Sequence, residues 1–324
     1  MRFRSEERGA VAVLVGLLVT VLFGFAGLAV DLGNLWASRR HLLTGTDAAA
    51  LAAAQSYAVD EDGCGTVAGH YVDENYPEAV MTGCTVAGVG SGKGAATVAA
   101  EAPVDFAFAG VLGVADPNVP AATTASWRSP SGVALPRPFA LCKDHPAVVD
   151  WVASPHGQSA PFRVAYGKED NDDCGGSPGN WGILDFDGAS NGTEEIERWT
   201  RFGYDDRIVH VGENLTGNPG AFSNSLADAL NDLIANDHVI TIPLFDTVTE
   251  SGTSATFHIY GFISARLVSY VATGPEDQRY LELRFLRMVV SGECCSTGPD
   301  TGTYVVQICD VDRRTVGATT GGCP

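Results

Sequence analysis

The chain has 324 residues, of which 45% are hydrophobic and 18% charged, and this balance excludes an intrinsically disordered protein. Its 39 acidic residues outnumber its 20 basic residues and give a net charge of −19. A surface this acidic repels phosphate backbones, so we expect no nucleic-acid partner.

The first predicted element is a transmembrane helix over residues 9–30, where no side chain is charged. At 1.5 Å per residue the segment forms a helix of about 33 Å, enough to cross a hydrocarbon core of about 30 Å. The main alternative is a cleaved signal peptide, because Gly27-Leu28-Ala29 is similar to a cleavage site. The apolar run is longer than the usual signal-peptide core, however, so we expect it to stay as an anchor in the lipid bilayer.

Beyond the span, apolar residues recur at helical spacing. The helix is therefore expected to continue as an amphipathic stalk to about Ala58. Gly45 weakens that helix by about 1 kcal/mol relative to alanine without ending it. The recurring positions are Leu32, Leu35, Trp36, Leu42, Leu43, Ala49, Ala50 and Ala53.

Four short motifs occur in order within residues 7–58. They are Arg8-Gly9-Ala10-Val11-Ala12 before the span, Ala29-Val30-Asp31-Leu32-Gly33 at its end, Arg39-Arg40, and Thr46-Asp47 followed by Ala48-Ala49-Ala50-Leu51-Ala52-Ala53-Ala54. Together they resemble the N-terminal segment of the TadE/TadG-like family of Flp-pilus assembly proteins. The motif positions are Gly9, Asp31, Gly33, Arg39, Arg40 and Asp47. A weaker resemblance covers residues 97–127, 180–188 and 242–246.

The resemblance implies a membrane-anchored, non-catalytic envelope protein of Flp-type pilus assembly or Tad secretion, acting as a minor pilin-like or pilus-anchoring component. Its partners would be other pilus-assembly or secretion-machine proteins. Leu14 stands where prepilin-like members carry a glutamate five residues after the cleavage glycine, so assembly into a shaft through that residue is not expected. The D-x-S-x-S motif of von Willebrand A domains is also missing. The alternative is a membrane-tethered surface-binding or carbohydrate-recognising module unrelated to pili.

The exposed part of the chain is expected to be α+β, so that the whole consists of a long N-terminal helix (1–58), a small pilin-like region (59–128) and a β-rich domain (139–311). In the small region we predict a helix over 64–76, ended by Pro77 and the glycine-rich run 83–94. Strands are predicted over 97–102 and 119–127, with a helix over 104–111 between them. Proline and glycine over residues 129–138 predict a linker.

The predicted second domain begins with turns over 168–179 and ends before a loose tail, 312–324. Strands are predicted over residues 181–186 and 238–244, helices over 193–200 and 221–235, and a β-meander over 255–272, 280–291 and 304–311. Residues 257–263 are rich in β-branched and aromatic side chains, as strands are.

All eight cysteines follow the span, at Cys64, Cys84, Cys142, Cys174, Cys294, Cys295, Cys309 and Cys323. An even number on one side of a membrane predicts disulfides in an oxidising compartment. The alternative is a zinc site, but the C-x₂-C spacing typical of zinc ligands does not occur. Cys64–Cys84 and Cys142–Cys174 are the nearest pairings, with two further bridges among the last four, and the adjacent Cys294 and Cys295 are each expected to bridge to a different partner. Basic residues flank both ends of the span, so the cysteines decide the orientation. They place the N-terminus in the cytoplasm and the C-terminal part outside a single-pass membrane protein.

No catalytic motif is recognisable, so we predict a protein that is not an enzyme and has no cofactor or metal. The acidic run 185–191 invites a calcium site but fails as an EF-hand, since Ala189, Ser190 and Ile196 occupy ligand or glycine positions. We therefore interpret the run 185–191 as a solvated turn, and the acidic loop 169–173 likewise.

Overall fold

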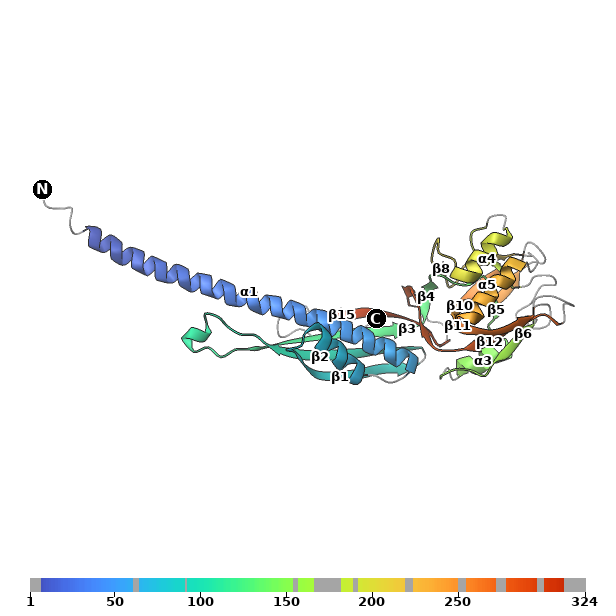
Figure 1. Ribbon diagram of the computed structural model, residues 1–324, viewed down its shortest axis with the longest axis horizontal. Coiled ribbons are helices and arrows are strands. Elements are labelled where there is room, and N and C mark those ends of the chain that lie inside the picture. Colours follow the sequence, from blue (N-terminus) through green and yellow to red (C-terminus); the bar gives the residue numbers. More distant parts are fainter. Residues whose placement is uncertain are drawn as a thin grey trace.

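Helix α1 (Glu7–Asp60) projects from one end of the molecule and then enters a proximal lobe, beyond which lies a distal lobe (Figure 1). The computed structural model describes residues 7–60, 64–90, 92–153, 157–165, 182–188, 192–218, 224–249, 255–271, 278–295 and 300–311. The α+β class with a long N-terminal helix is confirmed.

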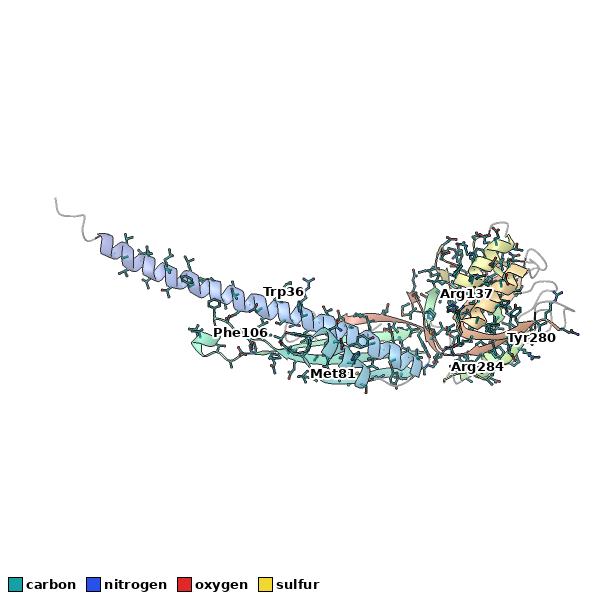
Figure 2. All side chains as sticks on the ribbon, viewed as in Figure 1. Trp36, Met81, Phe106, Arg137, Tyr280 and Arg284 are labelled. Carbon is teal, nitrogen blue, oxygen red and sulfur yellow. A yellow bond between two sulfur atoms is a disulfide. The ribbon has the colours of Figure 1, made fainter. Side chains whose placement is uncertain are left out.

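The two halves of α1 have different surroundings. Most side chains from residue 9 to residue 41 are exposed, and Figure 2 shows them projecting into open space around the helix. The second half buries one face, formed by Leu42, Thr46, Ala49, Ala50, Ala53, Ala54 and Ala58. These positions recur every three or four residues, so that the predicted amphipathic stalk is the helix of the proximal lobe.

The proximal lobe packs this helix face and α2 (Thr66–Asn75) on a five-stranded sheet. The sheet order is β1 (Val80–Gly90), β2 (Lys93–Pro103), β3 (Asn118–Arg128), β15 (Thr303–Val311) and β13 (Met288–Val289). Alanines dominate both sides of the interface, and these short side chains let the helix lie close to the strands.

Two predictions for this lobe are wrong. The glycine-rich run 83–94, expected together with Pro77 to end the helix, supplies most of β1 and the first residues of β2, because β1 pairs along its length with β2. Residues 104–111 do not form a helix. They belong to a loop between β2 and β3 that holds one 3₁₀ turn, η1 (Gly110–Leu112), since their amides bond to α1 and to one another rather than in a helical ladder.

The predicted β-meander is also wrong at its last strand, residues 304–311. β15 leaves the distal lobe and pairs antiparallel with β3, with Val305 opposite Arg128. Tyr304 accordingly belongs to the proximal core, where it is 1% exposed. The placement of residues 303–311 in a second domain is therefore corrected: the strand completes the first sheet.

The distal lobe is built on a larger sheet. Its order is β5 (Leu141–Cys142), β10 (Val239–Thr249), β11 (Thr256–Val271), β12 (Tyr280–Phe285) and β6 (Phe162–Ala165), with β9 (Asn214–Gly217) on β11 and β7 (Leu184–Asp185) on β9. Helix α5 (Asn224–Ala235) packs on β11, and α4 (Thr193–Phe202) packs on α5. A third helix, α3 (Pro146–Ala153), places Trp151 against Phe285. Apolar residues from all these elements form one core.

Residues 129–138, predicted as a linker, are mostly buried. Within them β4 (Pro130–Val133) pairs with β14 (Gly292–Cys294) and β8 (Val209–His210) in a small three-stranded sheet. A side chain at Gly132 would collide with Ile208 and His210, so the glycine allows this close strand contact. The segment thus joins the lobes through paired strands.

Candidate functional site at the helix junction

The exposed apolar part of α1 is the first component of the site. Among the described residues, α1 is the one helix long and apolar enough to cross a membrane, with a mean hydropathy of 2.6 in its most apolar stretch. Leu14, Leu17 and Phe23 are each about two-thirds exposed. Side chains of this kind are stable in lipid and costly in water, and none of the described elements covers them.

The second component is Asp31, the first charged residue after the apolar run. Its carboxylate accepts hydrogen bonds from three successive backbone amides of the β2–β3 loop, those of Ala107 (2.9 Å), Phe108 (3.2 Å) and Ala109 (2.7 Å). Asp31 is 3% exposed. Burial raises the pKa of Asp31, but the three amides outweigh that effect and hold the pKa below its ordinary value. The motif aspartate therefore binds backbone as an anion.

One helical turn earlier, Gly27 receives the Phe108 side chain. A Cβ placed at Gly27 would lie 2.8 Å from Cβ and Cγ of Phe108, which is closer than such atoms approach. Gly24, in contrast, has nothing within 4 Å of the same position. Gly27 and Asp31 lie on one face of α1, so the loop is fixed to the helix at both. Figure 1 shows this loop running beside α1 toward its N-terminal end.

The third component lies further along the helix, at Thr46 and Asp47. The Thr123 hydroxyl on β3 donates to Oδ1 of Asp47 at 2.7 Å and lies 3.0 Å from the Thr46 hydroxyl. Thr46 and Thr123 are almost fully buried. Thr46 and Asp47 thus bind strand β3 of the same hairpin whose loop is bound by Asp31.

The remaining motif positions have less contact with the lobe. A Cβ placed at Gly9 or at Gly33 would meet nothing within 4 Å, and both glycines are exposed. Arg40 places its guanidinium over the Trp36 ring at 5.6 Å. Arg39 is half-buried. A tryptophan and basic residues just beyond an apolar span are typical of the membrane–water interface.

One of the predicted disulfides is present in the proximal lobe. Cys64 and Cys84 form a disulfide, with Cα atoms 5.8 Å apart, that ties the start of α2 to β1. Cys142 and Cys309 are also disulfide-bonded. Cys174 and Cys323 lie outside the described residues, so the pairing Cys142–Cys174 stays a prediction.

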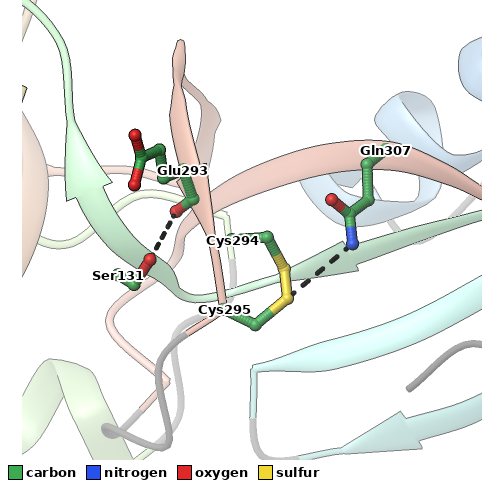
Figure 3. The surroundings of a disulfide bond; sticks show 5 residues. All are labelled: Ser131, Glu293, Cys294, Cys295 and Gln307. Atoms are coloured by element: carbon green, nitrogen blue, oxygen red, sulfur yellow. Dashed lines mark hydrogen bonds between the residues drawn. A yellow bond between two sulfur atoms is a disulfide. The ribbon is translucent and has the colours of Figure 1, made fainter.

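The expectation for Cys294 and Cys295 is wrong. We expected each to bridge to a different partner, but they bond to each other at the end of β14 (Figure 3). The sulfur of Cys295 accepts a hydrogen bond from the side-chain amide (Nε2) of Gln307 on β15 at 3.9 Å. The disulfide therefore links two neighbouring residues of the chain. It lies beside β15 and does not join β14 to another strand.

Two histidines of the distal lobe bond to acidic side chains. His210 on β8 contacts Glu213 through Nδ1 (2.9 Å) and Glu293 through Nε2 (3.2 Å), and the Glu213 contact raises its pKa most. His258 bonds Asp246 on the neighbouring strand at 2.7 Å. Within the described ranges, histidine, cysteine and acidic residues nowhere gather in a group of three or more that could hold a metal.

The calcium alternative is only partly covered by the structure. Asp185 accepts hydrogen bonds from the amides of Asp187 and Gly188, as in a polar turn. Residues 189–191 and the acidic loop 169–173 lie outside the described residues.

Sequence reasoning missed the loop that meets Asp31. It treated residues 104–111 as a helix and gave the loop no role. A signal was present, because residues 106–115 contain no charged side chain although the rest of the chain is strongly acidic, and Asp105 and Asp116 border the run.

Comparison with known families bears directly on this junction. Residues 9–56 match the family described as putative Flp pilus-assembly TadE/G-like. This segment of the chain is TadE/G-like. The matched residues include all six motif positions and nearly the whole of α1. No curated protein and no solved structure matches the chain.

The TadE/G-like match confirms the resemblance predicted for residues 7–58. It does not reach residues 97–127, 180–188 or 242–246, where the weaker resemblance stays a prediction. The match implies a role in Flp pilus assembly and interaction with other parts of that machinery. The apolar helix is consistent with a single membrane span.

Proposed function

We propose that this protein is a non-catalytic membrane anchor of Flp-type pilus assembly, held in the bilayer by residues 9–30 with both lobes on the extracytoplasmic side. The observation that carries the proposal is the division of α1. The same TadE/G-like helix is bare and apolar before Asp31 and buried in the proximal lobe after Leu42. A helix with these two halves joins a folded lobe to lipid without a flexible connection.

The cysteines support the extracytoplasmic placement of the lobes. All eight follow the span in sequence, and those within the described residues are disulfide-bonded. Disulfides persist in oxidising compartments and are rare in the cytoplasm. The proposed topology therefore places the N-terminal end of α1 on the cytoplasmic side.

The proposed mechanism is mechanical. Force applied to the lobes reaches the bilayer through α1, because Asp31, Asp47 and the alanine face hold the helix to the β2–β3 hairpin at several levels. Leu32 and Trp36 lie just beyond the span and are 56% and 65% exposed. This bare apolar face of α1 is where we place contacts with helices of other pilus-assembly proteins.

Cell fractionation tests the anchor. We expect the intact chain in membranes, released by detergent but not by high salt, and its lobes digested by protease added to spheroplasts. In the control variant, Leu14, Leu17 and Leu18 are all changed to Asp, since each charge near the middle of a span costs about 2.5–3.5 kcal/mol. That variant should leave the membrane fraction. A wild-type chain that is shortened and soluble would overturn the proposal.

A complementation experiment tests the link to pili. Deleting the gene should reduce surface fibres, the wild-type chain should restore them, and the triple Asp variant should not. Normal fibres in a deletion strain would contradict the pilus role even if anchoring holds. That result would favour a tethered binding module instead.

A further inference from the structure

We propose that the β2–β3 loop is a second membrane contact, whose tip (residues 106–115) enters the lipid interface beside α1. The inference rests on the proposed function, because it requires residues 9–30 to lie in a bilayer. It does not depend on which side of the membrane the lobes occupy.

The position of the loop along α1 is the first argument. Phe108 packs on Gly27, which precedes Val30, the last residue of the apolar run, by about 4.5 Å along the helix axis at 1.5 Å per residue. The loop therefore already lies beside the lipid-facing part of the helix. If residues 9–30 span the bilayer, Phe108 is at the boundary of the hydrocarbon core.

The side chains of the tip are the second argument. Val111 and Leu112 are each 84% exposed, and Phe108 and Val114 are each about half exposed. No charge interrupts the ten residues, whereas Asp105 and Asp116 stand at their ends. A cluster of bare apolar residues with acidic ends is unfavourable in water, but it matches a segment that dips into lipid while its ends stay at the headgroups.

The backbone of the tip is the third argument, because unpaired amides are costly in lipid. The Phe106 amide donates to Asp116, and the next three amides donate to Asp31. The amides of residues 111–114 donate to carbonyls within the loop, at Phe108, Ala109 and Gly110. Gly113 makes the closing turn with a φ of 81°, a conformation that favours glycine. The loop thus meets lipid with the backbone amides of residues 106–109 and 111–114 already paired.

Photocrosslinking in vesicles tests the inference with the full chain. A benzophenone amino acid replaces Leu112 in one variant, Leu18 of α1 in a second and Phe202 of α4 in a third. All three side chains are exposed, at 84%, 55% and 64%, so each should accept the probe without disturbing a core. Each variant is reconstituted in phosphatidylcholine vesicles that carry labelled lipid and is then irradiated.

We expect lipid adducts at positions 18 and 112 and only background at position 202, which lies in the distal lobe far from the N-terminal end of α1 (Figure 1). Adducts at 18 without adducts at 112 would overturn the second contact and leave the anchor intact. Loss of labelling at 18 would instead overturn the proposed function. Crosslinks from 112 to another copy of the chain, in place of lipid, would show a protein interface and reject the inference.

Discussion

Two aspartates of the TadE/G-like segment bind the same hairpin at two levels. Asp31 accepts amides of the β2–β3 loop, and Asp47 accepts the Thr123 hydroxyl on β3. They are 16 residues apart, which is about 24 Å along a helix. Since the pKa of Asp31 is lowered, its ionic contact is complete above the ordinary carboxyl pKa of 3.8 and is lost only as the pH falls through the still lower folded value.

Changing Asp31 to Asn tests the first of these contacts. Asparagine has one acceptor oxygen in place of two and presents an NH₂ group to the loop amides, so the three hydrogen bonds cannot all persist. We expect the amides of residues 107–109 to exchange with deuterium faster in the purified full chain.

Asp47→Asn is the matched control for that experiment. It removes a motif carboxylate of the same helix that bonds Thr123 and not the loop. It should leave exchange at residues 107–109 unchanged. Equal protection in Asp31→Asn and wild type would show that the loop is held by Phe108 packing alone.

At the level of elements, the contact between α1 and the hairpin depends on small residues along one helix face. Gly27 admits Phe108, and the alanines from Ala49 to Ala58 admit β2 and β3. The other side of the helix does not need small residues. Glycines on α1 therefore differ in whether a larger side chain fits in their place.

Gly27→Val and Gly24→Val form a matched pair for this contact. Valine at Gly27 would place its Cβ 2.8 Å from Phe108, so the loop must move away from α1, whereas valine at Gly24 meets open space. We expect faster exchange at residues 107–109 only in Gly27→Val. Helical content by circular dichroism should be the same in both variants. If the two behave alike, the packing of Phe108 on α1 does not hold the loop.

Elements with a strong internal pattern could be predicted from sequence, and those defined by distant partners could not. The helical period of α1 and the β-branched run of β11 predicted the bounds of both elements to within a few residues. Strand β1 was missed because its glycines and short side chains carry no strand pattern, and it is ordered by pairing with β2. The motif aspartates were found, but their bonding partners in residues 107–109 and at Thr123 depend on the folded hairpin.

At the scale of the whole molecule, the chain leaves the proximal sheet after β3 and returns to it first as the short strand β13 and then as β15. The distal lobe is thus inserted between two neighbouring strands of the sheet that holds α1. Two connections, at β4 and between β12 and β13, therefore join the lobes, where the linker prediction had expected one. A load on the distal lobe reaches the helix through adjacent strands of one sheet.

This topology predicts that the proximal lobe needs β15 but not the distal lobe. Val305 lies opposite Arg128, so extending the antiparallel register by one residue brings Tyr304 beside Ser129. Replacing residues 130–303 with Asn-Gly, a favoured two-residue hairpin turn, also removes the two-residue strand β13 but should preserve the β3–β15 pair. We expect this short chain, purified in detergent, to form the Cys64–Cys84 disulfide and to unfold cooperatively on heating.

A chain that stops at Arg128 is the control, and it should not behave in the same way. It lacks Tyr304, and losing a large buried aromatic side chain costs about 3–5 kcal/mol, comparable with the whole stability of a small lobe. It also leaves β3 as an unpaired edge next to the buried face of α1. We therefore expect rapid proteolysis and a broad thermal transition. If the two chains are equally stable, β15 does not contribute to the stability of the proximal lobe. If both are unfolded, the two lobes form one cooperative unit, and load spreads through the distal core as well.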